Sequence, residues 1–148
     1  MDQDKLKRMQ EKQMANRQKS YERHLNRQKA TDHLWRMRDF LNEIRISNRS
    51  SSHIGCFRGS PGAESDEHLD MKYQVWKQLK KWGHDVMTEV IFENGKRADV
   101  IDMTDGIIFE ILHTETVQEL QEKVKDYPEI FEVRHVRAGQ EFREELLL

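Results

Sequence analysis

The chain has 148 residues, of which 36% are hydrophobic and 35% charged, and its formal net charge is −2. Ordinary domains are roughly 45–50% apolar and ~25% charged, so we expect one domain with part of the chain outside its core. No apolar run approaches the ~18 residues of a membrane span, and one cysteine, Cys56, excludes an internal disulfide. We therefore expect a soluble cytoplasmic protein in a reducing compartment.

The two halves of the chain carry opposite charge. Residues 1–60 hold 14 Lys and Arg against 7 Asp and Glu, whereas residues 61–148 hold 11 against 20. Such a division favours an arm that meets a polyanion or an acidic partner. The alternative is a solvated helix that is basic without a partner.

The first 46 residues predict a basic helical arm. They contain neither Gly nor Pro and are rich in helix formers, so a long helix is expected. Residues 1–30 lack a sustained apolar heptad pattern and are predicted to be solvated or frayed. Residues 31–46 are amphipathic, which predicts packing either on the chain's own domain or in a homodimer. The apolar seam consists of Leu34, Met37, Leu41 and Ile44.

Residues 47–64 are rich in Ser and Gly and predict a linker, which leaves residues 65–148 as the compact domain. Ser65 is a good N-cap for a helix that Gly83 ends. A second helix begins with a capping box at Thr116 and ends before Pro128.

Four β-rich runs complete this domain. Asn94-Gly95 and Asp105-Gly106 are turn signals, and they predict an antiparallel meander. A helical crossover then places the fourth strand parallel to the third. The sequence therefore predicts an α/β domain of order α-β-β-β-α-β with a mixed four-stranded sheet. The predicted strands span 86–92, 97–103, 107–112 and 130–136.

Asp99 and Glu110 each interrupt an apolar strand, and a buried, unpaired carboxylate costs several kcal/mol, about 2–7 even for neutral polar groups. If residues 103 and 106 pair, then 99 and 110 pair as well and share a face, whereas a slip of one residue separates them. Two carboxylates on one face favour a cation such as Mg²⁺ between them. The alternative is that both reach solvent or pair with Lys96 and Arg97.

The stretch "DEHLDMKYQVWKQLKKWGHDVMTEVIFENGKRADVIDMTDGIIFEIL" resembles the core of PD-(D/E)XK nucleases, which have the restriction-endonuclease-like fold. The likeness lies in a Glu-His-x-x-x-Lys helix, a Gly-His-x-Val-x-Thr-Glu strand and a "RADV…EI" strand pair, and it covers residues 65 to about 136. It implies the same element order and Mg²⁺-dependent (or Mn²⁺-dependent) hydrolysis of DNA.

The resemblance also implies a set of site residues. Asp99 and Glu110 match the two metal-binding acids, and the carbonyl of Ile111 would be a third ligand. Glu67 matches an acid that some members of the family add to the site. Glu89 in the first strand is a further candidate ligand.

The chain departs from the family at the lysine that helps to activate water, because Leu112 stands at that position. Leucine neither activates water nor stabilises negative charge. We assign the catalytic cation to Lys96, while Lys72 and Lys123 are other lysines that can reach in from neighbouring elements. The alternative is a catalytically inactive nuclease fold that binds DNA or a protein.

A third hypothesis is an unrelated α/β adaptor whose N-terminal helix mediates assembly. It predicts Asp99 and Glu110 on opposite faces or far apart. In the nuclease hypothesis the acidic domain is a poor surface for DNA, and the arm supplies the phosphate contacts. The predicted nucleic-acid-binding residues are Lys5, Lys7, Arg8, Lys12, Arg17, Lys19, Arg23 and Arg27.

Overall fold

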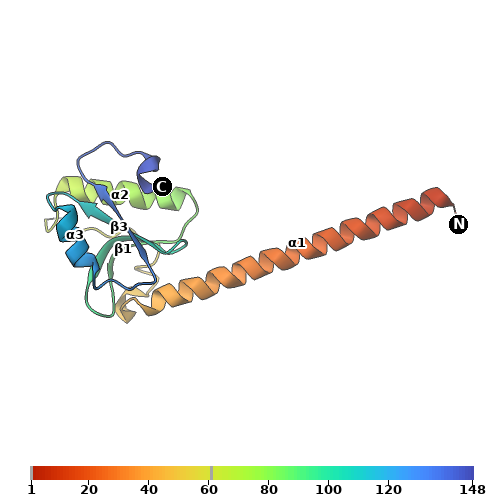
Figure 1. Ribbon diagram of the computed structural model, residues 1–148, viewed down its shortest axis with the longest axis horizontal. Coiled ribbons are helices and arrows are strands. Elements are labelled where there is room, and N and C mark those ends of the chain that lie inside the picture. Colours follow the sequence, from red (N-terminus) through yellow and green to blue (C-terminus); the bar gives the residue numbers. More distant parts are fainter. Residues whose placement is uncertain (1, 61) are drawn as a thin grey trace. The chain divides into compact units, whose positions relative to one another are not determined.

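The computed structural model describes residues 2–60 and 62–148 and divides the chain into two units between Arg36 and Met37. The first unit is the greater part of one helix, α1 (Gln3–Asn42), and the second contains all the strands (Figure 1). The remaining helices are α2 (Asp66–Lys81), α3 (Val117–Val124), and the short 3₁₀ helices η1 (Ile46–Asn48) and η2 (Glu144–Leu147).

The first unit is helical throughout residues 3–36, including the part predicted to be solvated or frayed. Its side chains are almost all exposed, as expected for a polar helix with no apolar face. No helix in the part of the chain that the structure describes is both long and apolar enough to cross a membrane.

The second unit is built on one mixed sheet in which the strands lie in the order β1-β2-β3-β4. Strands β1 (Val86–Ile91), β2 (Arg97–Asp102) and β3 (Ile107–Leu112) form the antiparallel meander, and β4 (Glu132–Arg137) runs parallel to β3. The α/β class and the mixed four-stranded sheet are thus confirmed. The predicted helix caps are present as well, because Ser65 accepts the amide of His68 and Thr116 forms a capping box with Glu119.

Each face of the sheet is covered by its own apolar cluster. Helix α2 covers one face, where Val75 and Leu79 pack against Val100 and Phe109 (Figure 1). The other face is covered by the C-terminal end of α1 and by the chain that follows α3, through Phe40, Ile44, Tyr127 and Phe131.

Most of the predicted apolar seam of α1 and the residues after it packs on this second face of the sheet. Ile44 is fully buried there, and Met37 and Leu41 pack against the same cluster. Leu34 remains 67% exposed. Three of the four seam residues therefore pack on the chain's own domain, and a homodimer through the seam stays a prediction for Leu34 alone.

Residues 43–58, which include most of the linker predicted at 47–64, run along β1 and hydrogen-bond to it. The Arg45 amide donates to the Ile91 carbonyl at 2.8 Å, and the Asn48 side chain accepts the Ile91 amide at 2.8 Å. His53 Nε2 lies 2.8 Å from the Thr88 carbonyl oxygen. The segment belongs to the compact unit, because its backbone and polar side chains bind the outer edge of the sheet.

Candidate active site

The candidate site begins where the pairing of β2 and β3 ends. Val100 lies opposite Phe109 and Ile101 opposite Ile108, a register that places residue 99 opposite residue 110. The backbone ladder stops at this point, and side chains bridge the two strands. The Ile111 amide donates to Asp99 Oδ2 at 2.8 Å, and the Asp99 amide donates to Glu110 Oε1 at 3.3 Å.

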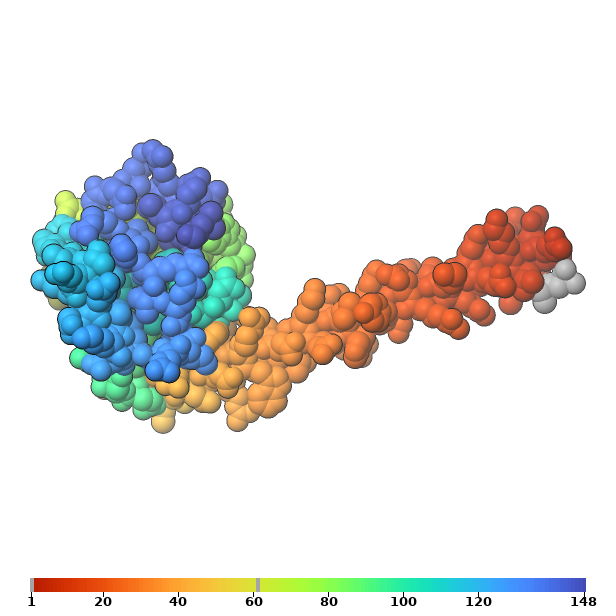
Figure 2. Space-filling model, in the orientation of Figure 1, coloured from red at the N-terminus to blue at the C-terminus, as the bar shows by residue number. Residues whose placement is uncertain are grey.

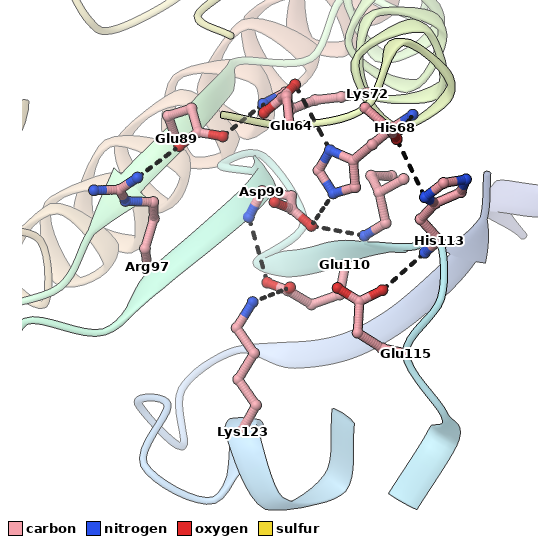
Figure 3. A network of polar contacts seen from close by, with 12 residues as sticks. Glu64, His68, Lys72, Glu89, Arg97, Asp99, Glu110, His113, Glu115 and Lys123 are labelled. Atoms are coloured by element: carbon pink, nitrogen blue, oxygen red, sulfur yellow. Dashed lines mark hydrogen bonds and ion pairs between the residues drawn. The ribbon is translucent and has the colours of Figure 1, made fainter. Parts of the chain in front are cut away.

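Asp99 reaches toward α2. Its Oδ2 lies 3.5 Å from Nε2 of His68, which is on the first turn of that helix (Figure 3). The Asp99 side chain is 14% exposed. Burial pushes the pKa of Asp99 up, but the hydrogen bond and charge of His68 and the Ile111 amide outweigh burial, so this pKa lies below its ordinary value. The same contact raises the pKa of His68.

Glu110 reaches toward α3 and is only 1% exposed. Its Oε2 lies 2.8 Å from Nζ of Lys123, and its Oε1 lies 3.0 Å from the hydroxyl of Tyr127. Burial and the nearby charge of Asp99 raise the pKa of Glu110 to about 7, against the opposing effect of Lys123. Glu110 is therefore a buried acid that titrates near neutral pH.

Both carboxylates line one pocket of about 740 Å³ between the start of α2 and α3. Glu64, His68 and Lys123 line it too, so acidic and basic side chains converge on the end of the β2–β3 ladder. The adaptor hypothesis requires the two acids to be on opposite faces or far apart, and this shared pocket contradicts it. Leu112 also lines the pocket and contributes no charge.

A buried ionic network lies beside the pocket. Lys72 is completely buried, and its Nζ lies 2.7 Å from Glu64 Oε2 and 2.5 Å from Glu89 Oε1. Glu89 also contacts Arg97 at 3.3 Å and has a positive φ of 51°, a conformation that is rare and strained outside glycine. Lys72 pairs both with Glu64, which lines the pocket, and with Glu89 on β1. The network therefore connects the pocket to β1 (Figure 3).

One oxygen of Glu64 faces the His68 ring in an ion pair and accepts no hydrogen bond from the described chain. Glu64 Oε1 is buried without a hydrogen-bond partner in the described chain, as is His68 Nδ1, which lies 3.6 Å away. Buried acceptors of this kind normally find a partner. The donor set of the pocket therefore has capacity for an additional ligand.

The structure brings some predicted site residues to this pocket and leaves others outside it. Asp99, Glu110 and Ile111 line the pocket, although the Ile111 amide already binds Asp99. Glu67 is exposed at the rim, where it contacts Nε2 of His113, a pocket residue. Glu89 is taken up by the ionic network and does not line the pocket.

Lys96 does not reach the site. Its Nζ lies 3.7 Å from Asp126 and its side chain is 49% exposed, because the β1–β2 turn carries it away from the pocket. The lysine that does reach Glu110 is Lys123, on the crossover helix. The lysine beside the acid pair is therefore Lys123 and not Lys96.

Sequence reasoning did not assign Glu64 or His68 to the site. A signal was present, because Glu64, His68 and Lys72 are spaced four residues apart; His68 and Lys72 lie on one face of α2, and Glu64 directly precedes its N-cap, Ser65. Assigning Glu64 to the linker concealed this pattern.

A second cluster could hold a metal ion at the far end of β2. The ligand atoms of His84, Asp102 and Asp105 lie within 4.8 Å of one another. Asp102 already uses both oxygens, since Oδ2 lies 2.7 Å from His84 Nδ1 and Oδ1 accepts the amides of Thr104 and Asp105. These contacts show that Asp102 holds the β2–β3 turn closed, which explains why the three side chains lie together.

Comparisons with known protein families, with curated proteins and with solved structures find no match for this chain. Its function is therefore inferred from its own residues.

Proposed function

We propose that this protein is a metal-dependent nuclease of the restriction-endonuclease-like fold, which hydrolyses phosphodiester bonds at the pocket of Asp99 and Glu110. The observation that carries the proposal is the meeting of these two acids from adjacent strands in one pocket with Lys123. The sequence resemblance supports it, and the element order agrees with that resemblance.

The donor set of the pocket fits a hard divalent cation such as Mg²⁺ or Mn²⁺. Asp99 and Glu110 offer carboxylate oxygens, and Glu64, one oxygen of which accepts no hydrogen bond in the described chain, lines the same pocket. Oxygen ligands of this kind are those that Mg²⁺ and Mn²⁺ prefer. When bound, such an ion would polarise the phosphoryl oxygen of the substrate.

The chain's own residues have separate roles in this proposal. Asp99 is held ionised by His68 and the Ile111 amide, so it is ready to bind a cation. Lys123 replaces the lysine that is missing at position 112, where the chain has leucine. Its ammonium would stabilise the negative charge that develops on the phosphoryl group. Tyr127 and the strand backbone fix the position of Glu110.

The test is cleavage of plasmid and single-stranded DNA with Mg²⁺ or Mn²⁺. We expect cleavage by the native protein, none by Asp99→Asn or Glu110→Gln, and ~10²–10³-fold less by Lys123→Met if Lys123 acts on developing charge. Lys125→Met is the matched control, because Lys125 follows the same helix but pairs only with exposed Glu122. We expect Lys125→Met to cleave like the native protein.

Leu112 is the observation that favours a second candidate, a catalytically inactive nuclease fold that binds DNA or a protein. Absence of cleavage by a native sample that melts cooperatively, with either metal ion, would contradict the nuclease and support this candidate.

A further inference from the structure

The cations of the arm are not spread evenly around its helix. Residues 3–36 of α1 include ten Lys and Arg against four Asp and Glu. At 3.6 residues per turn, six of the ten fall within an arc of about 100°. We name this set the basic row, and its members are Lys5, Arg8, Lys12, Lys19, Arg23 and Arg27.

The arc of the basic row contains no acidic residue. On the same helical projection, Asp4, Glu11 and Glu22 lie beside the arc, and Asp32 lies on the opposite side of the helix. The other four cations, Lys7, Arg17, Lys29 and Arg36, project outside the arc. Lys7 and Arg17, which the sequence analysis included among the nucleic-acid-binding residues, are therefore not part of the row.

The side chains of the basic row form no ion pairs in the described part of the chain, although Arg23 Nε donates to the Lys19 carbonyl of the same helix at 3.4 Å. All six are exposed. Figure 2 shows the atoms of this part of the helix, coloured red to orange. Lysines of the compact unit, such as Lys72 and Lys123, are by contrast paired with acids. Unpaired like charges repel one another, so the row favours an external polyanion.

The dimensions of the row match a nucleic-acid backbone. Arg27 lies 22 positions after Lys5, so the row spans about 33 Å at 1.5 Å per residue, close to the ~34 Å of one turn of duplex DNA. An anionic membrane is a poorer partner, because a helix lying in a membrane surface needs a continuous apolar face. Opposite the row, Leu6, Met14 and Tyr21 alternate with Gln10, Arg17 and Gln28.

We propose that the basic row is a docking surface for the phosphate backbone of duplex DNA, separate from the pocket of Asp99 and Glu110. The proposal extends the proposed function by naming the surface that holds the substrate. Phosphate contacts are independent of metal ions, so binding in EDTA and cleavage with Mg²⁺ can fail separately. The contacts carry no sequence information, so the row would bind DNA of any sequence.

The experiment is fluorescence anisotropy with a 20-base-pair duplex of arbitrary sequence, in EDTA, over a series of salt concentrations. Six phosphate contacts predict that log K falls against log salt with a slope of about −5. Two variants carry the same change in net charge. The row variant is Arg8→Gln, Lys12→Gln, Lys19→Gln and Arg23→Gln, and the control variant is Lys7→Gln, Arg17→Gln, Lys29→Gln and Arg36→Gln.

We expect the row variant to lose about 3–4 units of slope and the control variant less than 1. Equal losses in the two variants would overturn the row, because net charge alone would then explain binding. Circular dichroism of both variants checks that α1 stays helical. Failure of the native protein to bind the duplex at low salt also overturns the proposal, as does binding to phosphatidylserine vesicles in preference to DNA.

Discussion

Glu110 is the residue whose environment most constrains the chemistry of the pocket. It is buried at 1% exposure beside an ionised Asp99, and these two causes raise its pKa to about 7. Lys123 and Tyr127 oppose this shift without cancelling it. Near neutral pH the Glu110 carboxyl is therefore partly protonated, and a cation that binds there has to displace a proton.

From this we expect the affinity for Mg²⁺ to rise with pH through about 7, the pKa of Glu110. Below that pKa the free site holds the proton, and each pH unit lowers affinity up to about tenfold. Calorimetric titration with MgCl₂ between pH 5.5 and 8.5 measures the effect. Glu110→Gln should bind weakly at every pH, whereas Glu122→Gln, an exposed acid on α3, should keep the native profile. A native affinity that is flat across this range would contradict the prediction.

The two acids of the site could be predicted from sequence, whereas the cation beside them could not. Turn signals at Asn94-Gly95 and Asp105-Gly106 set the strand register, and the register brings Asp99 and Glu110 together. The position of Lys123 on α3 depends on tertiary packing, since Leu120 on the helix and Tyr127 after it are both buried. Local sequence does not encode that position, so it did not indicate that Lys123 rather than Lys96 lies beside Glu110.

At the scale of elements, the β2–β3 turn requires glycine at position 106 for two reasons, its backbone conformation and the space left by Phe40. Gly106 has a positive φ of 71°, and an added methyl group would lie 2.5 Å from the ring of Phe40. Gly139 also has a positive φ, 82°, but an added methyl group there meets nothing within 4 Å. The two glycines share one backbone requirement and differ in the space around them.

We expect Gly106→Ala to lower the free energy of unfolding by about 1–3 kcal/mol more than Gly139→Ala does. Both variants place a Cβ in the left-handed region, which costs roughly 1–2 kcal/mol, and Gly106→Ala adds the cost of overpacking against Phe40, typically 1–3 kcal/mol. Urea unfolding of the two variants measures the difference. Equal losses would show that Phe40 moves aside at little cost.

The helices and strands were well predicted because their signals are local. Ser65 and Thr116 cap helices with their own side chains, and apolar alternation marks the strands. The positive φ of Glu89 has no such local signal. The contacts that accompany it are made by Lys72 and Arg97, which lie 17 and 8 positions away in the sequence. The contacts of Asn48, His53 and Arg58 with β1 carry no local signal either, because their partners lie 43, 35 and 30 positions further along the chain.

At the scale of the whole molecule, stability and charge lie in different parts of the chain. Every member of the two apolar clusters, from Phe40 onward, belongs to the second unit. The unpaired cations of the basic row belong to the first. The arm can therefore change without affecting the core.

Removal of residues 2–33 should leave the urea midpoint and the m-value of the second unit unchanged, because no buried apolar contact is lost. A longer truncation through residue 45 also removes Phe40 and Ile44, and we expect it to cost at least 2–5 kcal/mol, about the effect of emptying one large core position. Denaturation followed by tryptophan fluorescence compares the two. A large loss from the shorter truncation would mean that the arm contributes to folding.

The segment that runs along β1 has a consequence for self-association. An exposed outer strand offers unpaired amides and carbonyls that can template pairing with a second copy. Arg45, Asn48, His53 and Gly55 bind four of those groups on β1, at Val86, Thr88 and Ile91, and so cover part of its outer edge. A proteolytic cut within residues 47–56 would release this cover, and the exposed strand of one molecule could then extend the sheet of another toward aggregation.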